Sequence, residues 1–160
     1  MNWRIVLLLA ILTQPFPVDA ANDAPLERAT LKGLTAVGVV IDTLDQELAH
    51  ENLTQDALQS RMERRLQNAG IPLVKDGREF LGLRVTQVRS KRGPVAVSIS
   101  IGLYQPVLLS RDRNIRTVTQ TWEVVTTLMA EPKVLYEASM TSVDELIDRF
   151  VAAYQSMNPK

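Results

Sequence analysis

The stretch from Val95 to Leu128 constrains the fold most, because apolar and polar side chains alternate along two long arms of it. In the first arm the odd-numbered residues are apolar except for Gln105, and most even-numbered residues are small or polar. The apolar set is Val95, Val97, Ile99, Ile101, Leu103, Val107 and Leu109. A period of two predicts a β-strand with one buried face and one face in water.

The second arm, 115–128, has the same period, and a polar turn at 110–114 joins it to the first arm. Its apolar set is Val118, Trp122, Val124 and Leu128. Its polar set is Thr117, Thr119, Thr121, Glu123 and Thr127. The two arms therefore predict an antiparallel hairpin with Trp122 in the core. Pro106 interrupts the first arm, so we expect a bend, a bulge or a sheet edge there.

Two amphipathic helices are predicted on either side of the hairpin in the sequence. The first begins after Thr54, a good N-cap residue, and ends at Gly70, which suits the left-handed position after a helix. The second opens at Ser142, whose spacing to Glu145 is that of a capping box. Its apolar stripe comprises Val143, Leu146, Ile147, Phe150, Val151 and Tyr154. Such a stripe is typical of a helix that lies on a sheet.

Two further strands complete the pattern. The segment from Leu34 to Leu44 is apolar on both faces, which favours a central strand, and Phe80 to Val88 alternates like the hairpin arms. The order is thus strand, helix, three strands, helix. It predicts an α+β two-layer sandwich, in which a four-stranded, mostly antiparallel sheet carries two helices on one face.

The first 20 residues have the pattern of an export signal. Arg4 precedes an apolar run from Ile5 to Leu12, and a small-residue cleavage site ends at Ala20. The run is far shorter than the roughly 20 residues that a membrane-spanning helix needs, so we expect no transmembrane segment in the mature chain. We expect a signal peptide at 1–20, a flexible N-terminal tail at 21–33, and a single α+β domain at 34–160. The protein would then be exported, and periplasmic or secreted.

Charge and cysteine content narrow the classes of function. The 18 basic and 18 acidic side chains give a formal net charge of 0, so no general field attracts nucleic acid. Two basic clusters flank the first hairpin arm, Arg89, Lys91 and Arg92 before it and Arg111, Arg113 and Arg116 after it. Solvated turns explain them, and contact with lipid headgroups or a polyanionic glycan is the alternative. The sequence has no cysteine, which indicates a bacterial exported chain without disulfides or the usual lipid-modified cysteine.

Residues with catalytic potential do not form a recognisable motif. His50 is the single histidine, and with Glu47 and Glu51 it would make a weak metal site at most. The sequence has neither a Gly-x-Ser-x-Gly elbow nor a glycine-rich phosphate loop. We therefore expect no cofactor and no metal. Asp42 and Asp45 leave open a carboxylate-based hydrolase, with or without a metal ion.

The polar side of the hairpin is the candidate binding surface. It is rich in hydroxyl groups and comprises Ser98, Ser100, Tyr104, Thr117, Thr119, Thr121 and Glu123, with Arg84 of the preceding strand within reach of Glu123. Threonine pairs on a wet strand face explain part of this composition. A docking surface for another sheet, a peptide or a glycan is the alternative.

The layout of the chain resembles that of small exported bacterial proteins of unknown function. It is also similar to envelope accessory proteins of transport and lipopolysaccharide assembly, and to the N-terminal domain of TolB. The residues behind this are the helix end at 66–71, the paired long strands with Trp122, and the closing segment 150–159. The resemblance implies an accessory role, with a protein or another envelope component as partner. It carries over no site residues.

The sequence thus predicts a non-enzymatic, exported binding or accessory module of the bacterial cell envelope that does not bind nucleic acid. The hydrolase at Asp42 and Asp45 is one alternative. A carrier of small apolar ligands between the helices and the sheet is another. The oligomeric state does not follow from the sequence.

Overall fold

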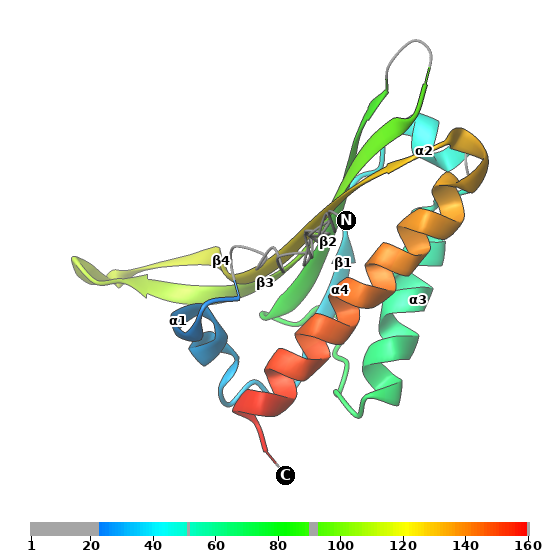
Figure 1. The fold of residues 1–160 in the computed structure, drawn as a ribbon. Helices are drawn as coiled ribbons and strands as arrows, with labels where there is room; N and C mark the ends of the chain where they lie inside the picture. Colours follow the sequence, from blue (N-terminus) through cyan, green and yellow to red (C-terminus); the bar gives the residue numbers. More distant parts are fainter. Residues whose placement is uncertain (1–22, 51, 90–92, 160) are drawn as a thin grey trace, which may run out of the picture.

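A computed structural model describes residues 23–50, 52–89 and 93–159 (Figure 1). The expected signal peptide and its cleavage site at Ala20 lie outside the described residues. The elements form an α+β domain in two layers, with the helices α3 (Gln55–Asn68) and α4 (Leu135–Met157) on one face of the sheet. This confirms the predicted fold class. Among the described residues, no helix combines the length and the apolar character needed to cross a bilayer.

The sheet has four strands in the order β1-β2-β3-β4. They are β1 (Gly38–Ile41), β2 (Phe80–Arg89), β3 (Val95–Leu109) and β4 (Asp112–Ala130). β1 pairs with β2 in parallel, and the other two pairings are antiparallel. The helix layer consists of α3 (Gln55–Asn68) and α4 (Leu135–Met157).

The first strand is shorter than predicted and lies at an edge of the sheet, not at its centre. Only residues 38–41 form β1, and the strand pairs with β2 alone. The apolar face of β1 that points away from the helices is not buried, because Val40 on that side is 48% exposed. The prediction of a central strand, which was based on apolar side chains on both faces, is therefore wrong.

Four short elements complete the fold: α1 (Pro25–Arg28), η1 (Ala29–Leu31), α2 (Gln46–His50) and η2 (Pro132–Val134). The first two fall in the segment expected to be a flexible tail. Its described residues pack on the domain, because Leu31 is fully buried and the Trp122 indole N–H donates to Asp23 Oδ1 at 2.9 Å. Part of the expected tail thus covers the end of the core.

The core lies between the sheet and the helices, as the alternation in the hairpin predicts. Ile99, Ile101 and Trp122 are at most 1% exposed on the sheet, and Met62 and Phe150 are fully buried on the helices. Trp122 meets Phe150 edge to face, with 5.3 Å between ring centroids. Such aromatic pairs add about 0.5–1.5 kcal/mol to the gain from burial.

The ends of α3 follow the predicted capping. Thr54 Oγ1 accepts the N–H of Ala57 at 3.2 Å, so it satisfies one of the free donors of the first turn. At the other end Gly70 has φ +76°, and the Ile71 N–H donates to the Leu66 carbonyl at 3.0 Å. This pattern ends a helix where glycine supplies the left-handed residue.

The start of α4 was predicted too late. The helix begins at Leu135, so Ser142 lies inside it and does not cap its N-terminus. Pro132 is the first residue of the preceding turn η2, a position that proline favours. Leu135 and Met140 are buried, so the apolar stripe extends about two turns further toward the N-terminus than the predicted start.

A β-bulge changes the hairpin at its middle. Leu103 pairs with Trp122 but Tyr104 pairs with Gln120, so Thr121 is an extra residue in β4. From there on, the side chains of β4 point to the face opposite to the one that simple alternation predicts. Beyond the bulge the hairpin leaves the body of the domain as a two-stranded ribbon (Figure 1). We call residues 105–120 the distal arm.

Candidate functional site on the open sheet face

The face of the sheet opposite α3 and α4, called the open face here, has no described helix on it (Figure 1). The pairing of the strands defines its members. They include Val40, Phe80, Gly82, Arg84, Thr86, Ser98, Ser100, Gly102, Tyr104, Gln120, Glu123, Val125 and Thr127. The predicted residues Ser98, Ser100, Tyr104, Glu123 and Arg84 are thus on one surface.

The three predicted threonines Thr117, Thr119 and Thr121 do not belong to this surface. Because of the bulge, Thr119 lies opposite Gln105 and Thr117 opposite Val107, on the side of the sheet that carries the helices. Thr121 is the bulged residue, and its hydroxyl donates to Gln105 Oε1 at 2.7 Å. A single extra residue in β4 therefore removes these three side chains from the predicted surface.

Two glycines shape the centre of the open face. Gly82 and Gly102 lie opposite each other on neighbouring strands. The ring of Tyr104 lies over Gly82, since a Cβ there would be 2.8 Å from Tyr104 Cε2. The ring also stacks on Phe80, with centroids 5.1 Å apart and planes 7° apart. The missing side chain at residue 82 therefore lets an aromatic pair lie flat on the sheet.

A shallow pocket of about 190 Å³ opens beside this aromatic pair. Its lining comprises Val40, Asp42, Phe80, Gly82, Leu83, Arg84, Ser100 and Tyr104. Arg84 Nε donates to Asp42 Oδ2 at 2.8 Å, which fixes a guanidinium and a carboxylate at the rim. The pocket thus combines an aromatic wall, an ion pair and a serine on β3.

The electrostatics of the rim follow from this ion pair. The hydrogen bond from Arg84 lowers the pKa of Asp42 below its ordinary value. The same bond, together with the negative charge of Asp42, raises the pKa of Arg84, and Glu123 adds to this through its charge. Asp42 is therefore the ion-pair partner of Arg84, and Glu123 lies near enough to reinforce the charge. Both paired side chains are more than half exposed, so the pair contributes little to stability.

The pocket is too small to enclose a metabolite. Sites for small molecules usually measure about 300–1,000 Å³ and surround most of the ligand. A shallow pocket of about 190 Å³ suits a single side chain or ring of a larger partner. Its chemistry fits recognition by stacking, ion pairing and hydrogen bonding.

The two carboxylates considered for hydrolysis have different hydrogen-bond partners. Asp42 is paired with Arg84, whereas Asp45 accepts the N–H of Glu47 at the start of α2, at 3.1 Å. A carboxylate paired with a cation and lowered in pKa is a weak general base at neutral pH. In the described part of the chain, no three acidic, histidine or cysteine side chains form a metal-binding group. Glu51 and the side chain of His50 lie outside the described residues.

Sequence reasoning missed several residues of the pocket. Asp42 was considered only as a catalytic carboxylate, and neither Phe80 nor Gly82 was assigned to a binding surface. A signal was present, because Phe80, Gly82 and Arg84 share one parity of β2. The pairing of Gly82 with Gly102 needs the register of the sheet and does not follow from the sequence.

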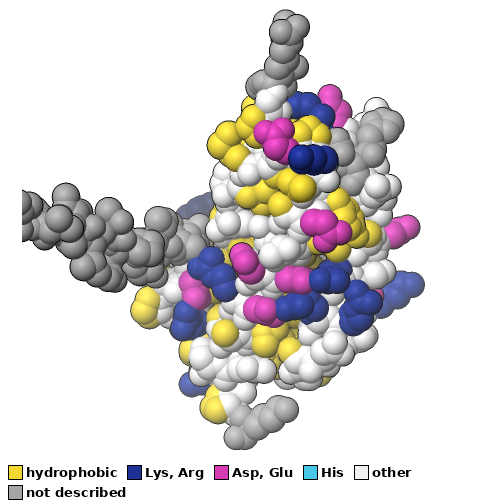
Figure 2. Space-filling model, turned by 45° about the vertical axis from the view of Figure 1, so that its right-hand side comes forward, with side chains coloured by type: hydrophobic (Ala, Val, Ile, Leu, Met, Phe, Trp, Pro, Cys, Tyr) yellow, Lys and Arg dark blue, Asp and Glu magenta, His cyan; other side chains and the backbone are white. Residues whose placement is uncertain are grey.

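The opposite surface of the domain is a mixed-charge helix face. Figure 2 shows basic and acidic side chains side by side over the helix layer. Arg61 donates to both oxygens of Asp144, and Arg65 donates to Asp148 at 2.6 Å. These contacts join α3 to α4, so the charges serve the packing of the two helices.

The chain matches no family model and no curated protein. Solved structures similar to it include the L103M variant of PelC from Paraburkholderia phytofirmans, described as a dodecamer, with 16% identity and a TM-score of 0.40 over 76% of this chain and 86% of that one. A minor lipoprotein from Acinetobacter baumannii is 11% identical, with a TM-score of 0.35 over 78% of this chain and 93% of that one. The rare lipoprotein B from Shewanella oneidensis is 12% identical, with a TM-score of 0.33 over 77% of this chain and 93% of that one.

Proposed function

We propose that this chain is a non-enzymatic binding module of the bacterial cell envelope, exported by its N-terminal signal, that holds a protein partner on its open sheet face. The pocket between the aromatic pair and the Arg84–Asp42 ion pair is the observation that carries this proposal. It lies on the one broad face of the described sheet that α3 and α4 leave uncovered.

The shape of the face supports a protein partner. Ser98, Ser100 and Thr127 have short side chains around the pocket, so a second surface can approach the strands closely. The pocket then receives one side chain of the partner, stacked on Tyr104 and hydrogen-bonded at the rim. Aromatic and arginine anchors in small pockets supply much of the affinity in protein interfaces.

The packing of the domain favours this function over a carrier of apolar ligands. The space between sheet and helices is occupied by large side chains, among them Trp122, Phe150 and Met62, each at most 1% exposed. A carrier would have to move these side chains to admit a ligand. Close-packed interiors resist such changes.

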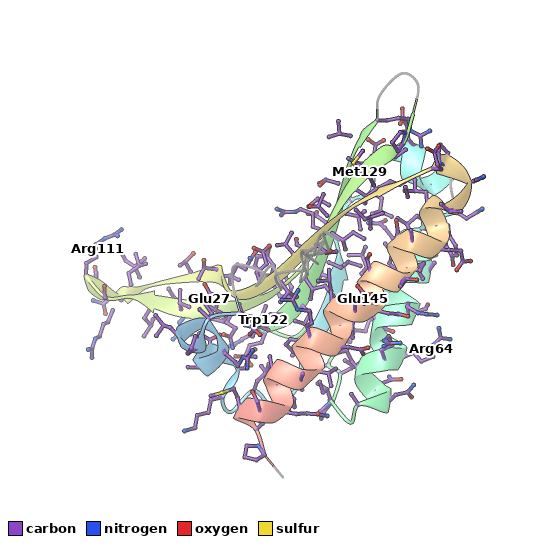
Figure 3. All side chains as sticks on the ribbon, in the orientation of Figure 1. Glu27, Arg64, Arg111, Trp122, Met129 and Glu145 are labelled. Atoms are coloured by element: carbon purple, nitrogen blue, oxygen red, sulfur yellow. The ribbon has the colours of Figure 1, made fainter. Side chains whose placement is uncertain are left out.

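Site-specific photo-crosslinking in the native envelope tests the proposal. A photoreactive amino acid at Ser98, which lies on the open face beside the pocket, should give one discrete adduct with a protein. The matched control carries the same amino acid at Arg64, an exposed residue on α3 labelled in Figure 3. It should give no such adduct.

A blocking variant makes the test specific to the pocket. Ser100→Trp fills the pocket from β3, and Tyr104→Ala removes its aromatic wall. Each should lower the adduct yield at Ser98 about tenfold or more, as loss of an interface anchor does. Thermal unfolding by circular dichroism checks that both variants fold. The same adduct from both crosslinker positions, or an unchanged yield in both folded variants, would reject the open face as the binding surface.

A further inference from the structure

The distal arm carries a surface that the open-face pocket does not explain. Six residues of β3, 104–109, lie beyond the bulge, a length of roughly 20 Å. Arg111 lies at the tip of the arm, well away from the helix residues Arg64 and Glu145 (Figure 3). A two-stranded ribbon without a covering layer is marginally stable in water. We therefore ask which kind of surface the side chains of the distal arm could contact.

Apolar side chains are exposed along the arm. Leu108 is 52% exposed, Val118 is 53% exposed and Ile115 is 44% exposed. Val118 lies opposite Pro106, and Leu108 is the next residue on the same face of the ribbon. Pro106, Leu108 and Val118 thus form one apolar face near the end of a projecting element.

Three arginines surround this apolar end. Arg111, Arg113 and Arg116 are all exposed, and none of them forms an ion pair with another residue of the described chain. The acid among them, Asp112, accepts the backbone N–H of Asn114 at 2.9 Å and so holds the turn. By contrast, Arg61, Arg65 and Arg84 in the body are all paired with carboxylates. The tip therefore carries a local positive charge, although the formal net charge of the whole chain is 0.

We propose that the distal arm docks on the surface of a bilayer that contains anionic phospholipid. Leu108 and Val118 enter the boundary between headgroups and acyl chains, and the three arginines bind lipid phosphates. Charge complementarity and the mixture of exposed apolar and basic side chains argue for this occupant, because interfacial anchors combine both. A soluble polyanion would use the arginines but leave the apolar face in water. Two arms from separate copies would bring like charges together.

This inference is independent of the proposed function, because it uses other residues and a lipid ligand. Flotation with unilamellar vesicles tests it. The chain from residue 21 onward should float with vesicles of phosphatidylcholine and phosphatidylglycerol, and should not float with phosphatidylcholine alone. The bound fraction should fall as salt is raised, because ions screen the arginines.

Two sets of variants separate the contribution of the arginine charges to vesicle binding from that of the apolar side chains. Replacing Arg111, Arg113 and Arg116 with Gln should weaken vesicle binding about tenfold or more. The control replaces Arg64, Lys75 and Arg78 with Gln, which removes the same charge from exposed sites on the body. Leu108→Ser with Val118→Ser should also weaken binding. Its control is Val88→Ser with Met129→Ser, whose side chains are 74% and 71% exposed at the other end of the sheet.

Several results would overturn the proposal. Equal losses in the arm variants and their controls would show that the arm has no special role. A soluble polyanion would be the ligand if Leu108→Ser with Val118→Ser left vesicle binding unchanged and dextran sulfate abolished it. Light scattering tests for a second copy of the chain. A dimer that forms without vesicles, and that the arm variants dissociate, would indicate that a second copy covers the arm. Failure to float with the anionic vesicles would reject lipid docking outright.

Discussion

The ring of Tyr104 can lie flat on the sheet because residue 82 has no Cβ. In Gly82→Ala the new methyl group would lie 2.8 Å from Tyr104 Cε2. The ring is rigid and stacks on Phe80, so it cannot yield without leaving its partner. We expect a loss of about 1–3 kcal/mol in unfolding free energy, the usual cost of overpacking. Urea denaturation followed by circular dichroism measures it.

Gly102→Ala is the matched control for this change. A Cβ at residue 102 would meet the side chain of Gln120, which is flexible and can turn toward solvent. The two glycines lie opposite each other in the same sheet, so strand propensity contributes similarly to both variants. We therefore expect the smaller loss at residue 102. Equal losses in the two variants would mean that the Tyr104 ring can move to make room for a methyl group at residue 82.

Asp23 links the N-terminal segment to the core through two donors. Its carboxylate accepts the Trp122 indole N–H at 2.9 Å and pairs with Arg28. Burial alone would raise the pKa of Asp23, but the hydrogen bonds from Arg28 and Trp122 outweigh it, and the pKa lies below its ordinary 3.8. The folded state therefore holds the ionised form more tightly than the unfolded state does.

The sign of the resulting pH dependence follows from linkage. A carboxyl group whose pKa is lower in the folded state than in the unfolded state stabilises the fold at pH values above its unfolded pKa. This stabilisation is lost as the pH falls through the folded pKa. Asp23→Asn should thus lower the free energy of unfolding at neutral pH, by less than about 1 kcal/mol because Arg28 is 39% exposed. The two proteins should converge in acid. A difference that stays constant from neutral pH into acid would contradict the assigned role of the carboxylate.

Predictions from local sequence succeeded where one residue and its neighbours determine the geometry. Thr54 and Gly70 set the ends of α3 as expected, since capping depends on side chains a few residues apart. Thr119 was misplaced because its direction depends on pairing with β3, which no local pattern reports. The same reason hid the contact between Tyr104 and Gly82, which are on different strands.

At the scale of elements, the bulge at Thr121 divides one hairpin into two parts with different surroundings. Before the bulge, Ile99, Ile101 and Val124 are buried under the helices. Beyond it residues 111–119 are exposed and most of residues 105–109 are half-buried, and Val118 is 53% exposed although alternation predicts it in the core. The length of the hairpin was predictable from its period, but the point where it leaves the body was not. One extra residue reverses every later side chain.

Hydrogen exchange should reveal this division. We expect backbone amides of 105–120 to exchange about 100-fold or more faster than those of 97–103, because a ribbon without a covering layer opens locally at little cost. Mass spectrometry of exchanged peptides measures the difference. Repeating it at lower protein concentration controls for pairing between copies. Equal protection along the whole hairpin in dilute protein would show that the arm is stabilised by the body.

The helix layer shows which element-scale features the sequence reports well. The apolar stripe from Val143 to Tyr154 placed α4 on the sheet, since a helical period is repeated over several turns. Its start was misplaced because Ser142 and Glu145 fit a capping box by spacing alone. Leu135 and Met140 already carried the stripe further toward the N-terminus. A stripe of buried positions is thus a better guide to a helix start than a single capping motif.

For the whole molecule, a single sheet carries two proposed binding surfaces. Ser100 lines the open-face pocket and Leu108 belongs to the distal arm, roughly 27 Å further along β3 if the strand is extended. Between these two residues β3 runs without a break, and on the other side of the sheet ion pairs such as Arg61 with Asp144 join α3 to α4.

Substitutions at the two surfaces should therefore act independently. Ser100→Trp should lower the crosslinking yield at Ser98 and leave vesicle binding unchanged, whereas Leu108→Ser with Val118→Ser should do the reverse. Changes more than about 10 Å apart without shared contacts usually add. The combined variant should thus show both losses, each of the size seen alone. If the arm variant also lowers crosslinking in protein that folds normally, the bilayer must position the domain for its partner, and the two surfaces would form one binding site.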